Sequence, residues 1–173
     1  MAEQIDPQPL TASIDVAAPP ATVWGVVSDV RRTGEWSPEC FRVLPLGPVR
    51  AGGLLLGVNR RGRIRWVTLS RVVSYRPERE IGWRVLTNRS EWRYELRPGP
   101  AGTTVTETRR TPRGEGRFAL WFTRVFLDGQ AVHDAELERG MRAGLERIGA
   151  LAEAMRARAG GGSRTPTPEG TRS

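Results

Sequence analysis

Apolar and polar residues alternate along residues 9–17, the first patterned stretch of the chain. The apolar positions share one side of an extended segment and the polar positions share the other: Leu10, Ala12, Ile14 and Val16 against Thr11, Ser13 and Asp15. A period of two is typical of a strand with one buried face. We therefore predict a half-buried strand at the start of the ordered chain.

The hydrophobic period then changes twice. Two prolines, which a helix tolerates in its first turn, precede apolar residues at helical spacing, namely Val23, Trp24, Val27 and Val30. This pattern predicts a short helix that ends before Gly34. From residue 40 to residue 111 the turn signals "LGPVRAGG", "NRRGR", "RPERE", "TNRS" and "RPGPAGT" separate short apolar runs. Such spacing predicts successive antiparallel strands joined as a meander.

A long amphipathic helix is predicted over residues 129–157. One apolar stripe holds Leu137, Met141, Leu145, Ile148, Ala152 and Met155, and at 1.5 Å per residue the helix is about 40 Å long. The flanking segments are poor in apolar residues. We expect residues 1–8 to be loosely ordered, residues 9–158 to form a single α+β domain, and residues 159–173 to be a disordered tail.

The amino-acid composition limits which disulfides and metal sites the protein can form. One cysteine and one histidine exclude an internal disulfide and a Cys/His metal cluster, so we expect no metal and no cofactor, and a reduced, cytoplasmic environment. No signal peptide is recognisable. The most apolar window, residues 118–127, is too short to span a membrane and carries Arg124.

A net charge of +8 would ordinarily suggest nucleic acid as a partner. Every basic residue is arginine, however, and a GC-rich coding bias produces the same composition without any binding purpose. Nucleic acid is therefore not favoured as a partner.

Three segments carry a family resemblance: "VWGVVSDVRRTGEWSPE", "WRYELRPGPAGTTVTET" and "GMRAGLERIGALAEA". In this order the chain resembles the polyketide cyclase/dehydrase and lipid-transport branch of the START-like (SRPBCC) superfamily, especially its actinobacterial members, over about residues 9–157. The resemblance implies the helix-grip fold, in which a curved antiparallel sheet of about seven strands wraps around a long C-terminal helix, with short helices after the first strand. It also implies a cavity between sheet and helix.

Strand alternation predicts which side chains line that cavity. Trp92, Tyr94 and Leu96 share one face, as do Ile81, Trp83 and Val85, and Trp66 lies opposite Arg65. Asn59 joins this set because the Gly57-x-Asn59 pair occupies a family-like position, where the glycine marks a bulge or a close backbone approach. These assignments predict an aromatic cavity with a few polar groups.

Glu107 falls on the buried face of its strand together with Val105. A carboxylate in an apolar cavity is costly, so either its pKa rises or Arg109, two residues along, neutralises it. A structural Glu107–Arg109 pair and a functional carboxyl are both open. The functional roles are a polar anchor for a ligand, or a general acid/base, for which Tyr94, Arg109 and His133 are further candidates.

On the C-terminal helix a stripe of residues at steps of three and four is expected to face the sheet: His133, Leu137, Gly140, Gly144 and Ile148. Two glycines inside a helix indicate a close approach, either by the sheet or by a ligand. His133 would lie at one end of the cavity.

The "EWSPEC" segment, residues 35–40, should link the short helix to the second strand at the rim of the cavity. Trp36 is placed to close one end, and Pro38 keeps Ser37 extended. Cys40 has only His133 as a candidate base, so we expect a small apolar residue and not a nucleophile. Residues 118–127 are a lid, part of the core, or a membrane contact.

Three functions follow from these patterns. The first is binding, for transport, storage or sensing, of a hydrophobic small molecule such as a lipid, a quinone or a polyketide-like compound. The second is a polyketide aromatase/cyclase that uses acid/base residues in the cavity. The third is a protein or membrane-surface interaction module, with transient membrane contact, that uses the basic exterior and residues 118–127. We expect a monomer or a homodimer.

Overall fold

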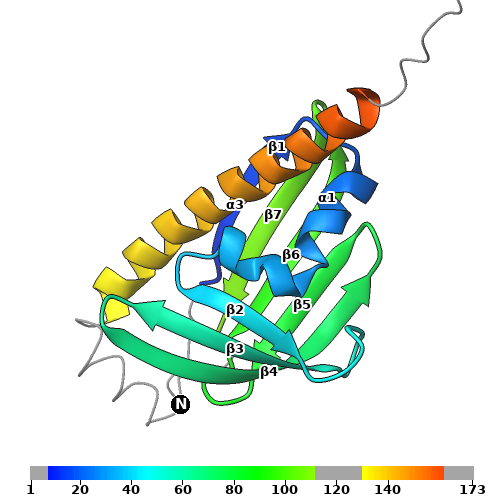
Figure 1. The fold of residues 1–173 in the computed structure, drawn as a ribbon. Coiled ribbons are helices and arrows are strands. Elements are labelled where there is room, and N and C mark those ends of the chain that lie inside the picture. The colour runs from blue at the N-terminus through cyan, green and yellow to red at the C-terminus, as the bar shows by residue number, and fades with distance from the viewer. Residues whose placement is uncertain (1–7, 112–129, 162–173) are drawn as a thin grey trace, which may run out of the picture.

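The computed structural model describes residues 8–111 and 130–161, with the side chains of residues 8–111 and 137–160. Within these ranges seven strands form one antiparallel sheet in the order β1-β7-β6-β5-β4-β3-β2 (Figure 1). The strands are β1 (Leu10–Val16), β2 (Cys40–Pro45), β3 (Leu54–Arg61), β4 (Ile64–Arg76), β5 (Glu80–Val85), β6 (Glu91–Gly99) and β7 (Gly102–Arg110). Strands β2 to β7 are neighbours in chain order, which confirms the predicted meander.

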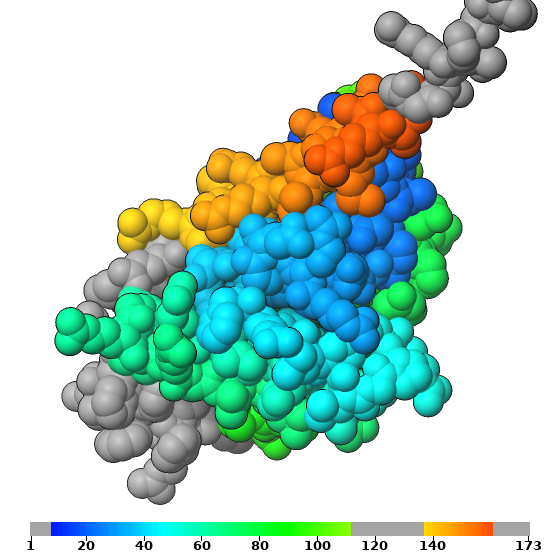
Figure 2. Space-filling model, viewed as in Figure 1, coloured from blue at the N-terminus to red at the C-terminus, as the bar shows by residue number. Residues whose placement is uncertain are grey.

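In the described part of the chain, three helices lie against the sheet: α1 (Pro20–Val27), the short 3-10 helix η1 (Val30–Glu35) and the long α3 (Gln130–Gly161). α3 runs diagonally across the curved sheet, beside α1 (Figures 1 and 2). The arrangement is the expected α+β helix-grip fold. α3 continues to Gly161, four residues beyond the end that the sequence pattern predicts for this helix.

The most tightly packed part of the core lies at one end of the space between sheet and helices. α3 contacts β1, α1 and β7, and α1 contacts β6. The residues at this end are almost fully buried: Val16, Val23, Val26, Val27, Val105, Leu145, Ile148 and Ala152. The same core continues along the inner faces of β2, β3 and β4 through Val43, Leu55 and Val72. Val43 and Leu55 also border the candidate site.

None of the helices in the described ranges is long and apolar enough to cross a membrane. Residues 118–127 lie outside the described residues, as does the side chain of His133.

Candidate ligand-binding site

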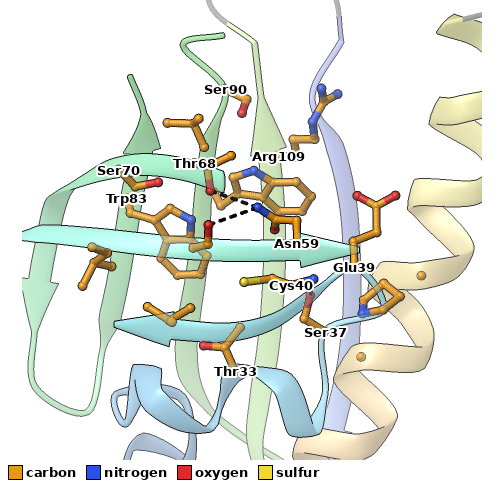
Figure 3. Close-up of a pocket in the computed structure, with 18 of the residues that line it drawn as sticks. Thr33, Ser37, Glu39, Cys40, Asn59, Thr68, Ser70, Trp83, Ser90 and Arg109 are labelled. Carbon is orange, nitrogen blue, oxygen red and sulfur yellow. Dashed lines mark hydrogen bonds between the residues drawn. The ribbon is translucent and has the colours of Figure 1, made fainter. Parts of the chain in front are cut away.

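A cavity of about 370 Å³ lies between the inner faces of β2 to β7, the 36–40 turn and the first described turns of α3 (Figure 3). Ten of the predicted ligand-binding residues line it: Trp36, Asn59, Trp66, Trp83, Trp92, Tyr94, Glu107, Leu137, Gly140 and Gly144. Their role in binding stays a prediction, but the structure brings them together around one space. A volume of this size falls at the lower end of small-molecule sites.

The aromatic wall of the cavity comes from the predicted alternation. Trp92 and Tyr94 point inward from β6, and Trp83 points inward from β5, opposite Trp92 in the strand register. The rings of Trp83 and Tyr94 pack with centroids 5.8 Å apart at an angle of 47°. Tilted aromatic pairs of this kind are favourable and stiff, so they give the cavity a fixed apolar side.

Glu107 is the only carboxylate of the described residues that is both buried to 5% exposure and part of the cavity lining. The hydroxyl of Tyr94 donates a hydrogen bond to its Oε1 over 2.9 Å. Burial raises the pKa of Glu107 to about 7, and the Tyr94 hydrogen bond opposes this rise. The pKa of Tyr94 is itself raised well above its usual range, first by burial and then by the charge of Glu107. Near neutral pH the carboxyl can therefore act as a proton donor or as an acceptor.

Arg109 does not form the ion pair with Glu107 that its position on the strand suggested. Its guanidinium lies 5.9 Å from the centre of the Trp92 ring, in a cation–π arrangement, and Tyr94 is the group that hydrogen-bonds Glu107. Arg109 borders the cavity all the same (Figure 3). The first of the two predicted alternatives, a raised carboxyl pKa, is the one that the structure shows.

Trp36 closes the cavity from the 36–40 turn and is 2% exposed. Its indole N–H is buried and makes no hydrogen bond to any described residue. It lies close enough to the Tyr94 hydroxyl to lower the pKa of Tyr94, although the geometry is not that of a hydrogen bond. A buried donor without a partner is rare in native proteins. This N–H is therefore available to an oxygen atom that enters the cavity.

The 36–40 turn is held by backbone contacts on both sides. A Cβ on Gly34 would lie 2.2 Å from the carbonyl oxygen of Phe41, so only glycine allows η1 to approach β2 this closely. Arg147 of α3 donates a hydrogen bond to the carbonyl oxygen of Trp36 over 3.2 Å, and Ser37 Oγ accepts one from the Cys40 N–H over 3.0 Å. The turn is thus fastened to both the sheet and the helix.

The glycines of α3 meet this turn. A Cβ on Gly140 would lie 2.9 Å from Pro38 Cγ, and one on Gly144 would lie 3.2 Å from the carbonyl oxygen of Trp36. The close approach that the sequence predicted is therefore made by neither the sheet nor a ligand, because the turn occupies that place. Both glycines still border the cavity.

Asn59 places a polar side chain on the apolar wall of the cavity, opposite α3. Its amide nitrogen lies 3.2 Å from Thr68 Oγ1 and within 3.5 Å of the carbonyl oxygens of Gly57 and Trp66 (Figure 3). A Cβ at position 57 would lie only 2.7 Å from the side-chain oxygen Thr68 Oγ1. The close neighbour of Gly57 is therefore a side chain and not another backbone segment, and the register shows no bulge there.

Cys40 also borders the cavity, where burial raises the pKa of its thiol to about 11. Its sulfur lies 3.5 Å from the carbonyl oxygen of Arg42, a distance at which the thiol donates a weak hydrogen bond. A thiol that holds its proton at neutral pH is a poor nucleophile. The structure thus supports the expectation that Cys40 is a packing residue.

Several cavity residues escaped the sequence analysis, among them Thr33, Val43, Ser70 and Ser90. Ser70 follows Trp66 by four residues, so alternation alone would have found it. No cluster of three or more possible metal ligands exists within the described ranges.

This geometry defines a protein with a mixed apolar and polar cavity inside a helix-grip fold, and comparison with known proteins gives the family. The family model described as polyketide cyclase / dehydrase and lipid transport matches residues 8–153. The chain therefore belongs to the polyketide cyclase/dehydrase and lipid-transport family. A search of the curated proteins finds no match.

Two solved structures illustrate the similarity. A polyketide-cyclase-like protein from Corynebacterium glutamicum is 29% identical, with a TM-score of 0.56, over 92% of this chain and 99% of its own. The Zhui aromatase/cyclase from a Streptomyces species is 23% identical, with a TM-score of 0.71, over 89% of this chain and 98% of its own. The second likeness shows the fold alone.

Proposed function

We propose that the protein binds an apolar, partly aromatic small molecule that carries a carbonyl or phenolic oxygen, and that it does so in the cavity between sheet and α3. The observation behind this proposal is the Tyr94–Glu107 hydrogen bond at the wall of an otherwise largely apolar space. The family, which is named for polyketide cyclases and lipid transport, agrees with a hydrophobic ligand.

The polar groups suit an oxygen acceptor. The Trp36 N–H has no hydrogen-bond partner among the described residues, and Glu107 in its neutral form can donate a proton from its carboxyl group. A ligand carbonyl that reached both groups would accept a hydrogen bond from the buried Trp36 N–H. Such a hydrogen bond contributes about 1 kcal/mol or more to the binding free energy. The tryptophans of the wall would supply the apolar contact.

A pair of ligands tests the proposal. α-Tetralone and tetralin differ by one carbonyl oxygen, so isothermal titration calorimetry at pH 6 should show α-tetralone binding about tenfold tighter. This preference should fall above the pKa of Glu107, because the carboxylate no longer donates and only the Trp36 N–H remains. Glu107→Gln should keep the preference at both pH values, and Glu146→Gln, at an exposed position on α3, should behave as wild type. Absence of binding for both ligands, and for a wider set of bicyclic aromatics, would contradict the proposal.

The second candidate is a cyclase-type enzyme in which Glu107 moves a proton to or from the substrate. A pKa of about 7 favours it, because a general acid/base works best when its pKa is near the working pH. The test is NMR observation of hydrogen–deuterium exchange at the carbon next to the α-tetralone carbonyl. An exchange rate that is higher with wild type than with the Glu107→Gln variant supports catalysis. Equal exchange rates contradict the enzyme and agree with a protein that only binds its ligand.

A further inference from the structure

The outer face of the sheet, which points away from α3, carries an apolar patch on β2, β3 and β4. The register sets Leu44 opposite Leu56 and Leu56 opposite Leu69, so three leucines form one row across the strands. Val58 and Val67 form a second row, and the N–H of Leu86 bonds the carbonyl oxygen of Leu69. We call these six residues the outer patch.

Three residues of the outer patch are open to solvent, and Leu56, Val58 and Leu69 are half-buried. Val67 is 63% exposed, Leu86 is 44% exposed and Leu44 is 38% exposed. Adjacent apolar residues that remain this exposed commonly mark a contact with a partner or a membrane. Trp66 and Thr68 line the cavity, and Val67 between them also borders it while it remains 63% exposed, so one stretch of β4 serves both surfaces.

Exposed arginines border the outer patch on the same face: Arg42, Arg60, Arg65 and Arg71. Arg60 and Arg65 lie directly opposite each other in the register, and like charges in that position destabilise a sheet. Arg60 lies over the Phe41 ring at 5.8 Å. Among the described residues, no carboxylate forms an ion pair with any of the four.

The neighbouring part of the outer face has a different charge pattern. On β5 and β6, Arg93 pairs with Glu80 and with Glu91, each at 2.9 Å, and Arg84 pairs with Glu91 at 2.9 Å. Cations there are matched by carboxylates of the protein itself. Arg42, Arg60, Arg65 and Arg71 have no such carboxylate among the described residues, which indicates an external anion as their counterpart.

We propose that the outer patch docks the protein onto an anionic lipid membrane. Its leucines and valines would lie at the boundary between headgroups and acyl chains, and the surrounding arginines would contact lipid phosphates. An acidic protein is a weaker match, because leucine and valine are under-represented among the residues that carry most of the binding energy at protein interfaces. A second copy of the chain would bring the same arginines together. The proposal does not rest on any ligand in the cavity.

Co-sedimentation of the full-length, ligand-free protein with vesicles tests it. Vesicles of phosphatidylcholine and phosphatidylglycerol in equal parts should bind the protein, and vesicles of phosphatidylcholine alone should not. The Arg60→Gln/Arg65→Gln double variant should bind about 30-fold more weakly, since each arginine near an anionic surface contributes about fivefold. It also removes a like-charge pair, so it should fold at least as well as wild type.

Two further variants separate docking from general charge attraction. Val67→Thr keeps the shape and strand preference of the side chain and should weaken binding at unchanged net charge. Arg97→Gln/Arg110→Gln removes two exposed cations outside the outer patch and should have little effect. Equal losses in the two double variants overturn the proposal. So does wild-type protein that stays in the supernatant with both kinds of vesicle, as an acidic protein partner would predict.

Discussion

Tyr94 and Glu107 lie directly opposite each other on β6 and β7, and the tyrosine hydroxyl donates a 2.9 Å hydrogen bond to the carboxyl group. Both side chains are 5% exposed. One cross-strand pair thus places a titratable group inside an apolar cavity and supplies the hydrogen bond that limits the energetic cost of burying it.

Replacing Tyr94 with Phe should raise the pKa of Glu107 above its value of about 7. Burial, which raises the pKa, remains, whereas the hydrogen bond that lowers it is lost. The side-chain carboxyl resonance in a carbon-13 NMR titration reports this change. Tyr75→Phe is the matched control, because Tyr75 packs against Trp24 away from the carboxyl. A Glu107 pKa that stays the same or falls in Tyr94→Phe would contradict the assignment.

Stability should fall as pH rises through the range from about 4.5 to about 7. The folded state holds the Glu107 proton more tightly than the unfolded chain, whose carboxyl has a pKa of 4.5. The resulting stabilisation is fully present below pH 4.5 and is lost through the folded-state pKa of about 7. It amounts to roughly 3 kcal/mol at about 1.4 kcal/mol per pKa unit.

Urea unfolding at several pH values measures this dependence. Glu107→Gln, whose amide does not titrate, should lose less stability than wild type over the same range. Parallel curves for the two proteins would mean that Glu107 titrates normally and is not the buried acid described above.

Gly34→Ala should destabilise the protein by about 2–4 kcal/mol, because the new Cβ would meet the Phe41 carbonyl oxygen at 2.2 Å and a backbone atom cannot easily move away. Gly25→Ala is the control. A Cβ there would lie 3.7 Å from Met155 Cε, an ordinary contact, and alanine favours the helix by about 1 kcal/mol. Chemical denaturation gives both values, and equal effects would show that the η1–β2 approach is looser than described.

Cys40 should react slowly with iodoacetamide. With a thiol pKa of about 11 instead of 9.0, the thiolate fraction at pH 8 is lower by about 100-fold than for an ordinary cysteine. The alkylation rate, followed by mass spectrometry, should keep rising with pH beyond pH 9. A rate that levels off near pH 7 would instead reveal an activated thiol.

The strand faces were predictable because a period of two, with one face buried, assigns each side chain to a side. Trp83, Trp92 and Tyr94 were placed correctly for this reason, and so was the buried position of Glu107. The hydrogen-bond partner of Glu107 was not predictable, because the register between β6 and β7 depends on the turn that joins them and on the packing of both strands. Arg109, two residues away in sequence, was the wrong partner.

Alternation also fails where both faces of a strand are apolar. In β4 the sequence could place Trp66 inward only with the help of Arg65, and it could not show that Val67 would remain exposed. Likewise, the spacing of Gly140 and Gly144 indicates a close neighbour but not its identity. The turn that contacts them is about a hundred residues away in the chain, and only the folded protein brings the two together.

Because of the cavity, part of the interior of the protein is not packed by its own side chains. Side chains around an unfilled space lack the dispersion contacts that a continuous interior provides, so the empty form is held together less tightly than its size would suggest. We expect an occupant of the space between the tryptophans and the start of α3 to supply these missing contacts. The amount of intact protein in a cell would then follow the supply of that occupant, because the unoccupied form would unfold more often and be degraded sooner.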